Sequence, residues 1–409
     1  MIKDLFVTAF IADIHFGSSD PERLYNELKV NFLNVLKGKR IDLVVLGGDT
    51  FHNVISMNTI TSRYVLLFME KLLKICKKNS IKHIRVIQGT MSHDNNQLNV
   101  FKMYENDPDI DFKIVLTLTE EDLPEGIRIL YVPEEYLLNS NHKNYYDEYL
   151  NCKKRYDMIL GHGTFKESHF AMKNQESEIG MSSAPVFDSK YFVSACSGPI
   201  YFGHIHKKLT IREHIHYPGS FSRFCHGEEN DKGWFLSVYD KNTSKYVHEF
   251  IVNNLAPKYI TKEISLDEFD NLYELVLTKP SIQTFDFLKV RIMIEKEDEE
   301  IYLKEASIKE LCSGIKNVKI EFIDKEDKER ELEEKIITEA YESGYTEKYT
   351  SFDTLMEYLY GEVWIVDSYG TFFNDSEPSY DVYVVNENWP EGCLFKHIPE
   401  SCIDTGLLG

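Results

Sequence analysis

The sequence predicts an α/β protein: a main domain of two layered sheets, then a small αβ domain, C-terminal helices and a small β-rich end. Two observations predict this architecture. Short apolar runs alternate with helical patterns over about the first 250 residues, and the composition then changes. At 409 residues and 43% hydrophobic side chains, the chain is long enough for one large domain and at least one smaller unit.

Eight apolar runs predict the strands of the main domain, residues 1–254. They span residues 5–13, 41–49, 83–90, 111–116, 127–133, 156–162, 198–204 and 233–240. Two segments have helical spacing, from Pro21 to about Leu36 and from about Thr59 to Cys76. In the second helix we expect Leu66, Leu67, Met69, Leu72, Leu73 and Cys76 to face inward. The alternation predicts two packed sheets or one large mixed sheet.

Residues 257–324 predict the small αβ domain. Its strand-like runs, at 259–265, 287–295 and 317–324, accompany a helical segment around Leu272, Leu275 and Val276. Residues 325–361 predict two amphipathic helices, the second capped by Thr350 or Ser351. Their apolar faces form a local hairpin or dock onto another helix. Residues 363–409 predict a small acidic β-like module of unknown role.

The negative charge lies mainly in the C-terminal part. The formal charge is -21, and residues 1–254 hold 30 Lys and Arg against 32 Asp and Glu, whereas residues 255–409 hold 16 against 35. Nucleic-acid binding draws most of its affinity from Lys and Arg. A near-neutral first domain that commits several carboxylates to metal ions can still present a basic face, while the acidic remainder faces solvent or a protein partner.

Cysteine usage and hydropathy predict a soluble cytoplasmic protein with no membrane partner. The seven cysteines are scattered, with neither CxxC pairs nor a disulfide framework, which fits a reducing compartment. The start of the chain does not resemble a secretory signal, because Asp13 and His15 break its apolar run. No apolar stretch reaches the roughly 18 to 20 residues that cross a bilayer.

Metal-capable side chains follow the predicted strands at their C-terminal ends. The motifs are ADIHFG with Asp13 and His15, GGDTFH with Asp49 and His52, GTMSHDN with His93 and Asp94, GHG with His162, and GHIH with His204 and His206. An open α/β sheet places its site at this edge, and the neighbouring glycines let the backbone turn sharply. We therefore expect these side chains to converge.

Carboxylates mixed with imidazoles suit Mn²⁺, Fe²⁺ or Zn²⁺ better than Ca²⁺ or Mg²⁺. Five or six donors fit two ions about 3.5 to 4 Å apart, bridged by a carboxylate and a hydroxide, which predicts hydrolysis of a phosphate ester. A single histidine near a strand end is usually structural. We give that interpretation to the remaining histidines: His83, His142, His169, His214, His216, His226, His248 and His397.

In this order the motifs resemble those of the calcineurin-like metallophosphoesterase superfamily over residues 13–206, and within it the SbcD-type DNA repair exonucleases. GGDTFH is similar to the GDxFH of the nuclease branch. The segment YPGSFSRFCHGEENDKGWFLSVYD (217–240) resembles the one in which those nucleases run a Pro-Gly-Ser turn into a Glu and a Lys-Gly-aromatic strand. The resemblance implies a metallophosphoesterase (nuclease) domain at 1–254 and a capping domain at 257–324.

The resemblance also implies roles for the motif residues. One ion would be held by Asp13, His15 and His206, and the second by His162 and His204, with Asp49 bridging both. His93 would stabilise the transition state or act as general acid, oriented by Asp94. His52 would help with the substrate or leaving group, and the two ions would be Mn²⁺.

The loop after the third strand departs from the family pattern. The family usually has Gly-Asn-His-Asp or Glu, with the Asn on the second ion, whereas here Thr90, Met91 and Ser92 separate Gly89 from His93. Ser92 takes the position of the Asn and is expected to offer a weak oxygen ligand. Asn95, Asn96 or a water are the alternatives. A weaker ligand predicts looser binding of the second ion.

The resemblance further implies that the chain acts on DNA as a homodimer. Residues 325–361 would bind an SMC-like ATPase subunit of the SbcC type, which makes the chain the nuclease subunit of an SbcCD-like complex in DNA repair, recombination or replication. The compact length and the divergent loop favour a virus-encoded homologue in the host cytoplasm. Two other functions fit the motifs: a small-molecule or nucleotide phosphodiesterase or phosphatase, and a non-catalytic scaffold for the ATPase.

Overall fold

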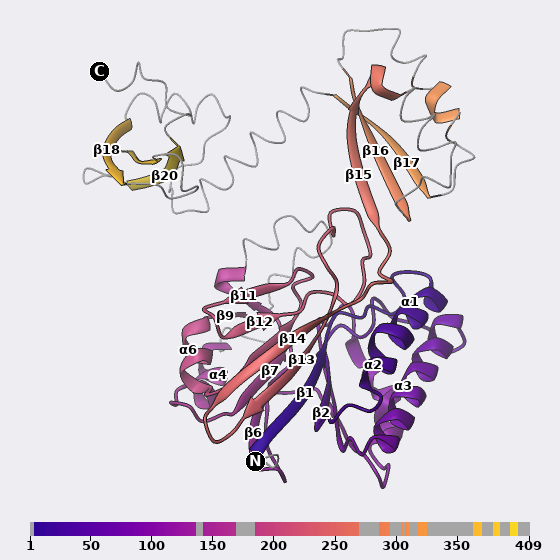
Figure 1. The fold of residues 1–409 in the computed structure, drawn as a ribbon, viewed down its shortest axis with the longest axis vertical. Helices are drawn as coiled ribbons and strands as arrows, with labels where there is room; N and C mark the ends of the chain where they lie inside the picture. The colour runs from indigo at the N-terminus through magenta and orange to yellow at the C-terminus, as the bar shows by residue number, and fades with distance from the viewer. Residues whose placement is uncertain are drawn as a thin grey trace. The chain divides into compact units, whose positions relative to one another are not determined.

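The computed structural model describes residues 4–135, 142–168, 185–269, 286–294, 305, 307–310, 312, 317–324, 363–369, 379–384 and 393–399. The chain divides into two compact units. The first comprises Met1–Lys262, Glu274–Lys289 and Lys316–Lys319, and the second comprises Glu263–Tyr273, Val290–Ile315 and Ile320–Gly409. The side chains of interest all lie in the first unit, which holds the two large sheets seen in Figure 1.

One six-stranded sheet has the order β14-β13-β1-β2-β3-β4. Its strands are β1 (Leu5–Ile11), β2 (Leu43–Gly47), β3 (His83–Ile87), β4 (Asp111–Val115), β13 (Gly233–Asp240) and β14 (Lys245–Val252). Strands β1 to β4 run parallel, whereas β13 pairs with β1 antiparallel and β14 with β13. The parallel pairing brings the carboxyl ends of β1, β2 and β3 to one edge.

The other six-stranded sheet has the order β11-β12-β10-β7-β6-β5. Its strands are β5 (Thr119–Leu123), β6 (Ile127–Val132), β7 (Met158–His162), β10 (Ile200–Gly203), β11 (Leu209–Ile211) and β12 (Ile215–Tyr217). The four central strands run parallel and the two edge strands antiparallel. Of the two predicted arrangements, the structure therefore has the two packed sheets.

The side chains of β1 alternate between two apolar layers, as a period of two requires. Phe6 and Phe10 lie between the two sheets, in one cluster with Leu160 and Tyr201. Val7, Ala9 and Ile11 face the helices on the other side. A third cluster packs the second sheet against α4 (His142–Leu150) and α6 (Ser189–Ala195). Figure 1 shows the resulting order of layers, helix, sheet, sheet and helix.

Both helices predicted in the first half of the main domain are confirmed. Asp20 caps α1 (Pro21–Leu28), and the helical run continues through a π turn (Lys29–Leu33) and α2 (Asn34–Leu36). Thr59 caps α3 (Ile60–Lys78). The buried face of α3 consists of Ser62, Val65, Phe68, Met69, Leu72, Leu73 and Cys76. Leu66 and Leu67, predicted to face inward, are only half-buried, so the packed face is turned slightly from the predicted one.

The short elements of the first unit are the 3-10 helices at Asn95–Tyr104 and Lys166–Ser168 and a two-stranded sheet of β8 (Thr164–Phe165) and β9 (Val186–Phe187). All eight strands predicted for the main domain are present. The sequence analysis missed β5, β8, β9, β11, β12 and β14. Within the described part of the chain, no helix is long and apolar enough to span a membrane.

The predicted strands after residue 257 are also present. They form two three-stranded sheets: β15 (Tyr259–Ser265), β16 (Phe287–Ile294) and β17 (Val318–Asp324), then β18 (Val363–Tyr369), β19 (Ser379–Val384) and β20 (Cys393–Pro399). A 3-10 turn at Leu266–Glu268 follows β15. The helix expected around Leu272, Leu275 and Val276, and the two helices expected in 325–361, lie outside the described residues.

Candidate metal centre

The candidate site lies where the carboxyl ends of strands from both sheets meet. One sheet supplies side chains just after β1, β2 and β3, and the other supplies them at the ends of β7 and β10. The approach is so close that a Cβ on Gly48 would lie 2.1 Å from Nδ1 of His162. Gly48 also has φ +94°, in the left-handed region that favours glycine. The two edges can meet only because this residue has no side chain.

Asp13, His15 and His206 form the first group of candidate ligands. One atom from each lies within 4.8 Å of the other two, and all three side chains are buried. Nε2 of His15 is 2.9 Å from Nε2 of His206. The two oxygens of Asp13 accept the backbone N–H of His204 at 2.9 and 3.1 Å, so Asp13 also fixes the loop that carries His206.

Asp49, His162 and His204 form the second group, again with one atom each within 4.8 Å. Nδ1 of His162 donates to the carbonyl oxygen of Gly47 at 2.9 Å, which leaves Nε2 as the atom with a lone pair. That Nε2 is buried, makes no hydrogen bond and lies 3.3 Å from Oδ2 of Asp49. A buried imidazole nitrogen without a hydrogen bond, facing a carboxylate, is the arrangement of a metal ligand.

Asp49 stands between the two groups. Its Oδ2 is 3.3 Å from Nε2 of His162 in the second group and 3.9 Å from Nε2 of His15 in the first. Burial opposes ionisation of this carboxyl, but the neighbouring His162 and His15 outweigh that effect and hold the pKa of Asp49 well below its usual value. The carboxylate is therefore an anion placed to bridge two cations.

The donor set fits two borderline divalent ions. Each group combines one carboxylate with two imidazoles, as Mn²⁺, Fe²⁺ and Zn²⁺ prefer. The backbone supports the same interpretation, because four of these residues lie in the left-handed region: Asp13 (φ 50°), His15 (φ 51°), Asp49 (φ 48°) and His204 (φ 99°). Each such conformation costs about 1–3 kcal/mol, and clusters of them are typical of functional sites.

A buried pair behind His206 orients the first group. Nδ1 of His206 lies 2.7 Å from Oε1 of Glu228, so Nε2 is directed at His15. Lys232 donates from Nζ to the carbonyl oxygen of His206 at 2.8 Å. Burial alone would raise the pKa of Glu228, but the hydrogen bond to His206 and the charge of Lys232 outweigh it and lower the pKa to about 2. Both residues come from the segment 217–240 that the sequence analysis singled out.

His52 and His93 lie against the first group. Their ligand atoms fall within 4.8 Å of that of His15, and the two rings stack with centroids 5.4 Å apart. Nδ1 of His93 meets the carbonyl oxygen of His52 in a short hydrogen bond. Both rings are partly exposed, unlike the six buried ligand candidates. The structure thus brings both predicted catalytic histidines to the site.

Asp94 is buried between two of the loops that form the site. Its oxygens accept the backbone N–H groups of Gly89 at 2.8 Å and Phe51 at 3.0 Å, so the carboxyl ties the loop after β3 to the loop after β2. Nδ1 of His93 is held by the His52 carbonyl, and a direct orienting contact from Asp94 stays a prediction. Burial and the charge of Asp49 raise the pKa of Asp94 to about 7.

Ser92 is exposed, and the site is approached instead by Thr90 and Glu134. Oγ1 of Thr90 lies 3.2 Å from Oδ2 of Asp49, and Oε2 of Glu134 lies 3.2 Å from Nδ1 of His204. The sequence analysis missed both residues. A signal was available for Glu134, because it follows β6 just as the motif residues follow their strands.

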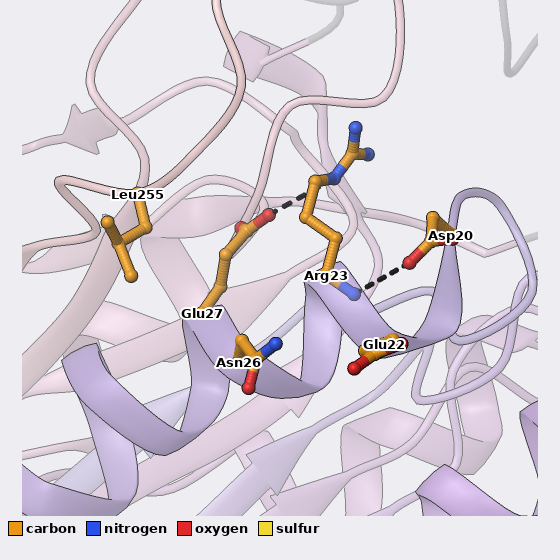
Figure 2. Close-up of a pocket in the computed structure, with 6 residues that line it drawn as sticks. All are labelled: Asp20, Glu22, Arg23, Asn26, Glu27 and Leu255. Carbon is orange, nitrogen blue, oxygen red and sulfur yellow. Dashed lines mark hydrogen bonds and ion pairs between the residues drawn. The ribbon is translucent and has the colours of Figure 1, made fainter.

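A separate cavity of about 400 Å³ opens at the first turns of α1, lined by Asp20, Glu22, Arg23, Asn26, Glu27 and Leu255. Figure 2 shows that Asp20 accepts the backbone N–H of Arg23, whereas the Arg23 guanidinium lies 3.5 Å from Oε1 of Glu27. The single cation of this lining is therefore paired with an acid, among two further acidic side chains, and the cavity does not suit an anionic substrate. Asn253 donates to Oε2 of Glu27 at 2.8 Å and to the carbonyl oxygen of Phe221 at 3.0 Å. The backbone N–H of Phe221 reaches the carbonyl oxygen of Asp13 at 3.3 Å, so this face supports the site.

Comparison with known proteins gives a sequence relative of viral origin. No protein-family model matches the chain. The protein named "Putative phosphoesterase 244L" of Invertebrate iridescent virus 6 is 24% identical over 277 residues, which cover 64% of this chain and 87% of the relative. Solved structures of a cold-active protein tyrosine phosphatase and of a point mutant of it each cover 59% of the chain, and 78% and 80% of their own chains. Their identities are 11% and 13% and their TM-scores 0.25 and 0.26, values too low to define a shared fold.

Proposed function

We propose that the protein is a metal-dependent nuclease that hydrolyses phosphodiester bonds at DNA ends or in structured DNA. The observation that carries this proposal is the convergence of two buried ligand groups on Asp49, with His52 and His93 beside them. The likeness to a viral protein named as a phosphoesterase supports phosphoester hydrolysis as the reaction class.

The site residues divide into metal ligands and proton donors. A pair of Mn²⁺ ions, when bound, would supply a hydroxide nucleophile and neutralise charge on the phosphoryl oxygens. Asp13, His15 and His206 would hold one ion, and Asp49 would contact both. His162 and His204 would hold the other. These side chains are at most 5% exposed, which keeps bulk water from screening their charges.

His93 is the proposed transition-state stabiliser or general acid. Because its Nδ1 donates to the His52 carbonyl, Nε2 is the atom that meets the phosphate. A protonated His93 would give its Nε2 proton to a phosphoryl oxygen or to the leaving oxygen. The stacked ring of His52 would contact the substrate or leaving group on the same side.

Two features favour DNA over a small phosphodiester. The sequence features similar to the nuclease branch, GGDTFH and the segment 217–240, both supply residues to the site. His52 of the first contacts His93, and Glu228 and Lys232 of the second hold His206. By the same resemblance we propose action as a homodimer with an SMC-like ATPase of the SbcC type in DNA repair, recombination or replication. The helices proposed to bind that ATPase, in 325–361, lie outside the described residues.

The test is cleavage of end-labelled linear duplex DNA by the purified chain with Mn²⁺. We expect degradation that His93→Ala lowers at least 100-fold. The control is His214→Ala, because His214 is exposed on the turn between β11 and β12 and outside both ligand groups. Hydrolysis of a generic phosphodiester dye without DNA cleavage, even with the ATPase partner present, would contradict the nuclease proposal in favour of a small-molecule phosphodiesterase. Loss of neither activity in His93→Ala would remove His93 from the mechanism.

A further inference from the structure

We propose that Glu134 and Thr90 are ligands of the second metal ion, which makes this site richer in oxygen than its Asp49, His162 and His204 group. The inference rests on the proposed two-metal function, but it concerns which atoms hold the ion. Ser92, the oxygen ligand expected from the sequence, is exposed. Glu134 is only 2% exposed and lies at the end of β6, facing the second group.

Four side-chain atoms close a ring of neighbours, and a fifth lies next to two of them. Oγ1 of Thr90 lies 3.2 Å from Oδ2 of Asp49 and 3.4 Å from Oε2 of Glu134. That Glu134 oxygen lies 3.9 Å from Nε2 of His162, which in turn is 3.3 Å from the starting oxygen of Asp49. The fifth atom, Nδ1 of His204, is 3.2 Å from Oε2 of Glu134 and 3.4 Å from Oγ1 of Thr90.

These separations match a coordination shell. Ligand atoms held about 2.0–2.2 Å from one ion in tetrahedral or octahedral geometry lie about 3–3.6 Å from their neighbours. Five of these six separations fall between 3.2 and 3.4 Å, and the sixth is 3.9 Å. The alternative is that Glu134 only forms a hydrogen bond with His204. That bond alone would not explain why Nε2 of His162 and Oγ1 of Thr90 also lie close to the same Glu134 oxygen.

The backbone holds both added ligands in position. The N–H of Thr90 donates to Oδ1 of Asp49 at 2.6 Å, which fixes the hydroxyl beside the bridging carboxylate. The N–H of Glu134 donates to the carbonyl oxygen of Gln88 at 3.3 Å, which joins the end of β6 to the end of β3. A Cβ on Gly89 would lie 2.2 Å from Oδ1 of Asp49, so the loop that carries Thr90 can approach only with glycine there.

The charge of the cluster also favours a cation. Asp49 and Glu134 are buried carboxylates whose side-chain neighbours in this cluster are imidazoles and one hydroxyl, so a divalent ion between them would offset the cost of burying two acids together. The second site, with two carboxylates and a hydroxyl beside its two imidazoles, is a harder donor set than the first, with one carboxylate and two imidazoles. The second site should therefore prefer Mn²⁺ to Zn²⁺ more strongly than the first site does.

The test is calorimetric titration of the metal-free full-length protein with Mn²⁺ and, separately, with Zn²⁺. We expect the wild type to bind two ions. Glu134→Gln should weaken Mn²⁺ binding at one site at least 100-fold and Zn²⁺ binding there less than tenfold, with the other site unchanged. Thr90→Val, which removes only the hydroxyl, should weaken Mn²⁺ binding at that site about tenfold. In an Asp13→Asn background, which disables the first site, Glu134→Gln should abolish the remaining Mn²⁺ binding.

Glu135→Gln is the matched control, because its half-buried carboxylate lies next to Glu134 in the chain but accepts from the Leu118 N–H at 2.6 Å and the Tyr145 hydroxyl at 3.1 Å. Unchanged Mn²⁺ affinity in Glu134→Gln would overturn the proposal. Equal losses for Mn²⁺ and Zn²⁺ would also overturn it, since that pattern means Glu134 only orients His204. If Glu134→Gln does not fold, Thr90→Val decides. Two bound ions in a wild type that cleaves no phosphodiester would refute the proposed function and leave the ligand assignment intact.

Discussion

At the residue scale, the site is held by conformations that unaided chains avoid. Asp13, His15, Asp49 and His204 all have positive φ, and such a residue costs about 1–3 kcal/mol unless its surroundings impose it. Backbone hydrogen bonds between neighbouring loops impose these conformations here. The N–H groups of Asp13 and His15 donate to the carbonyl oxygens of Gly48 and Asp49, so the loops after β1 and β2 hold each other.

Glu228 offers a test of how orientation affects metal affinity. Its Oε1 is the partner of Nδ1 of His206, and it does not belong to the described ligand groups. Removing such a carboxylate usually costs 10- to 100-fold in metal affinity. We expect Glu228→Gln to weaken Mn²⁺ binding at the first site by about that factor and leave the second site unchanged, as measured by calorimetric titration.

Glu229→Gln serves as the control, because Glu229 is the exposed neighbour of Glu228. An unchanged first-site affinity in Glu228→Gln would show that Lys232 and the loop backbone suffice to orient His206. A loss at both sites would indicate that Glu228 supports the whole loop rather than one imidazole.

Residue types at strand ends were enough to predict the six buried ligand candidates, because metal chemistry restricts which side chains can serve and parallel strands bring their ends together. Residue types did not predict that Thr90, rather than Ser92, lies beside Asp49. Which side chain of a loop faces inward depends on the path of its backbone. Here the Asp94 carboxylate accepts the N–H of Gly89, Thr90 faces Asp49 and Ser92 faces solvent. That contact joins two loops and has no local sequence signal.

At the element scale, the strands differ in how clearly the sequence marks them. Strands β1, β2, β7 and β10 are buried on both faces and appear as mainly apolar runs, so their positions could be predicted. Strand β3 (HIRVI) is also buried, although His83 and Arg85 interrupt its apolar residues. Edge strand β5, with the sequence TEEDL, and β14, with no fully buried residue, carry no such run. Pairing with neighbours defines them, and pairing partners are distant in the sequence.

Strand β12 carries a buried histidine that should make stability depend on pH. Nε2 of His216 is 2.9 Å from the hydroxyl of Tyr246, and its ring lies 4.4 Å from that of His248. Burial, followed by the charges of His248 and His214, lowers the pKa of His216 to about 3. Between pH 6.5 and 3 the unfolded chain therefore binds more protons at this residue than the folded protein, so stability falls as the pH falls.

We expect His216→Gln to flatten this dependence. In the wild type the residue should contribute a loss of up to about 1.4 kcal/mol per pH unit below pH 6.5, while His216→Gln keeps an amide that does not titrate. The free energy of unfolding from urea titrations between pH 7 and 4.5 is the measurement. Glu213→Gln, on the exposed turn before β12, is the control. Parallel pH profiles for wild type and His216→Gln would show that His216 becomes charged in the folded state.

For the first unit as a whole, the layered packing and the site impose opposite demands. The apolar layer between the sheets, with Phe10, Leu160 and Tyr201, is favourable without any ligand. At the strand ends the same two sheets bury Asp13, Asp49 and Glu134 together, which is unfavourable without cations. The sequence predicted the layers and the ligand motifs. Their joint effect on stability depends on how two sheets, built from separate stretches of the chain, face each other.

Metal removal should therefore lower the melting temperature of the first unit. A ligand that binds only the folded state stabilises it by about 2.7 kcal/mol when its free concentration is 100 times its Kd, so two ions contribute about 5 kcal/mol. For a unit of this size, about 1 kcal/mol shifts Tm by about 2–4 °C, which predicts a drop of about 10–20 °C on chelation. Differential scanning calorimetry with Mn²⁺ and with EDTA measures this drop in melting temperature.

Ca²⁺ should restore much less of the melting temperature than Mn²⁺ does, because Ca²⁺ prefers oxygen ligands alone and each ligand group here includes two imidazoles. If neither Mn²⁺ nor EDTA changes the melting temperature, the buried acids are neutralised by protons instead of metal ions. That result would contradict the proposed metal centre.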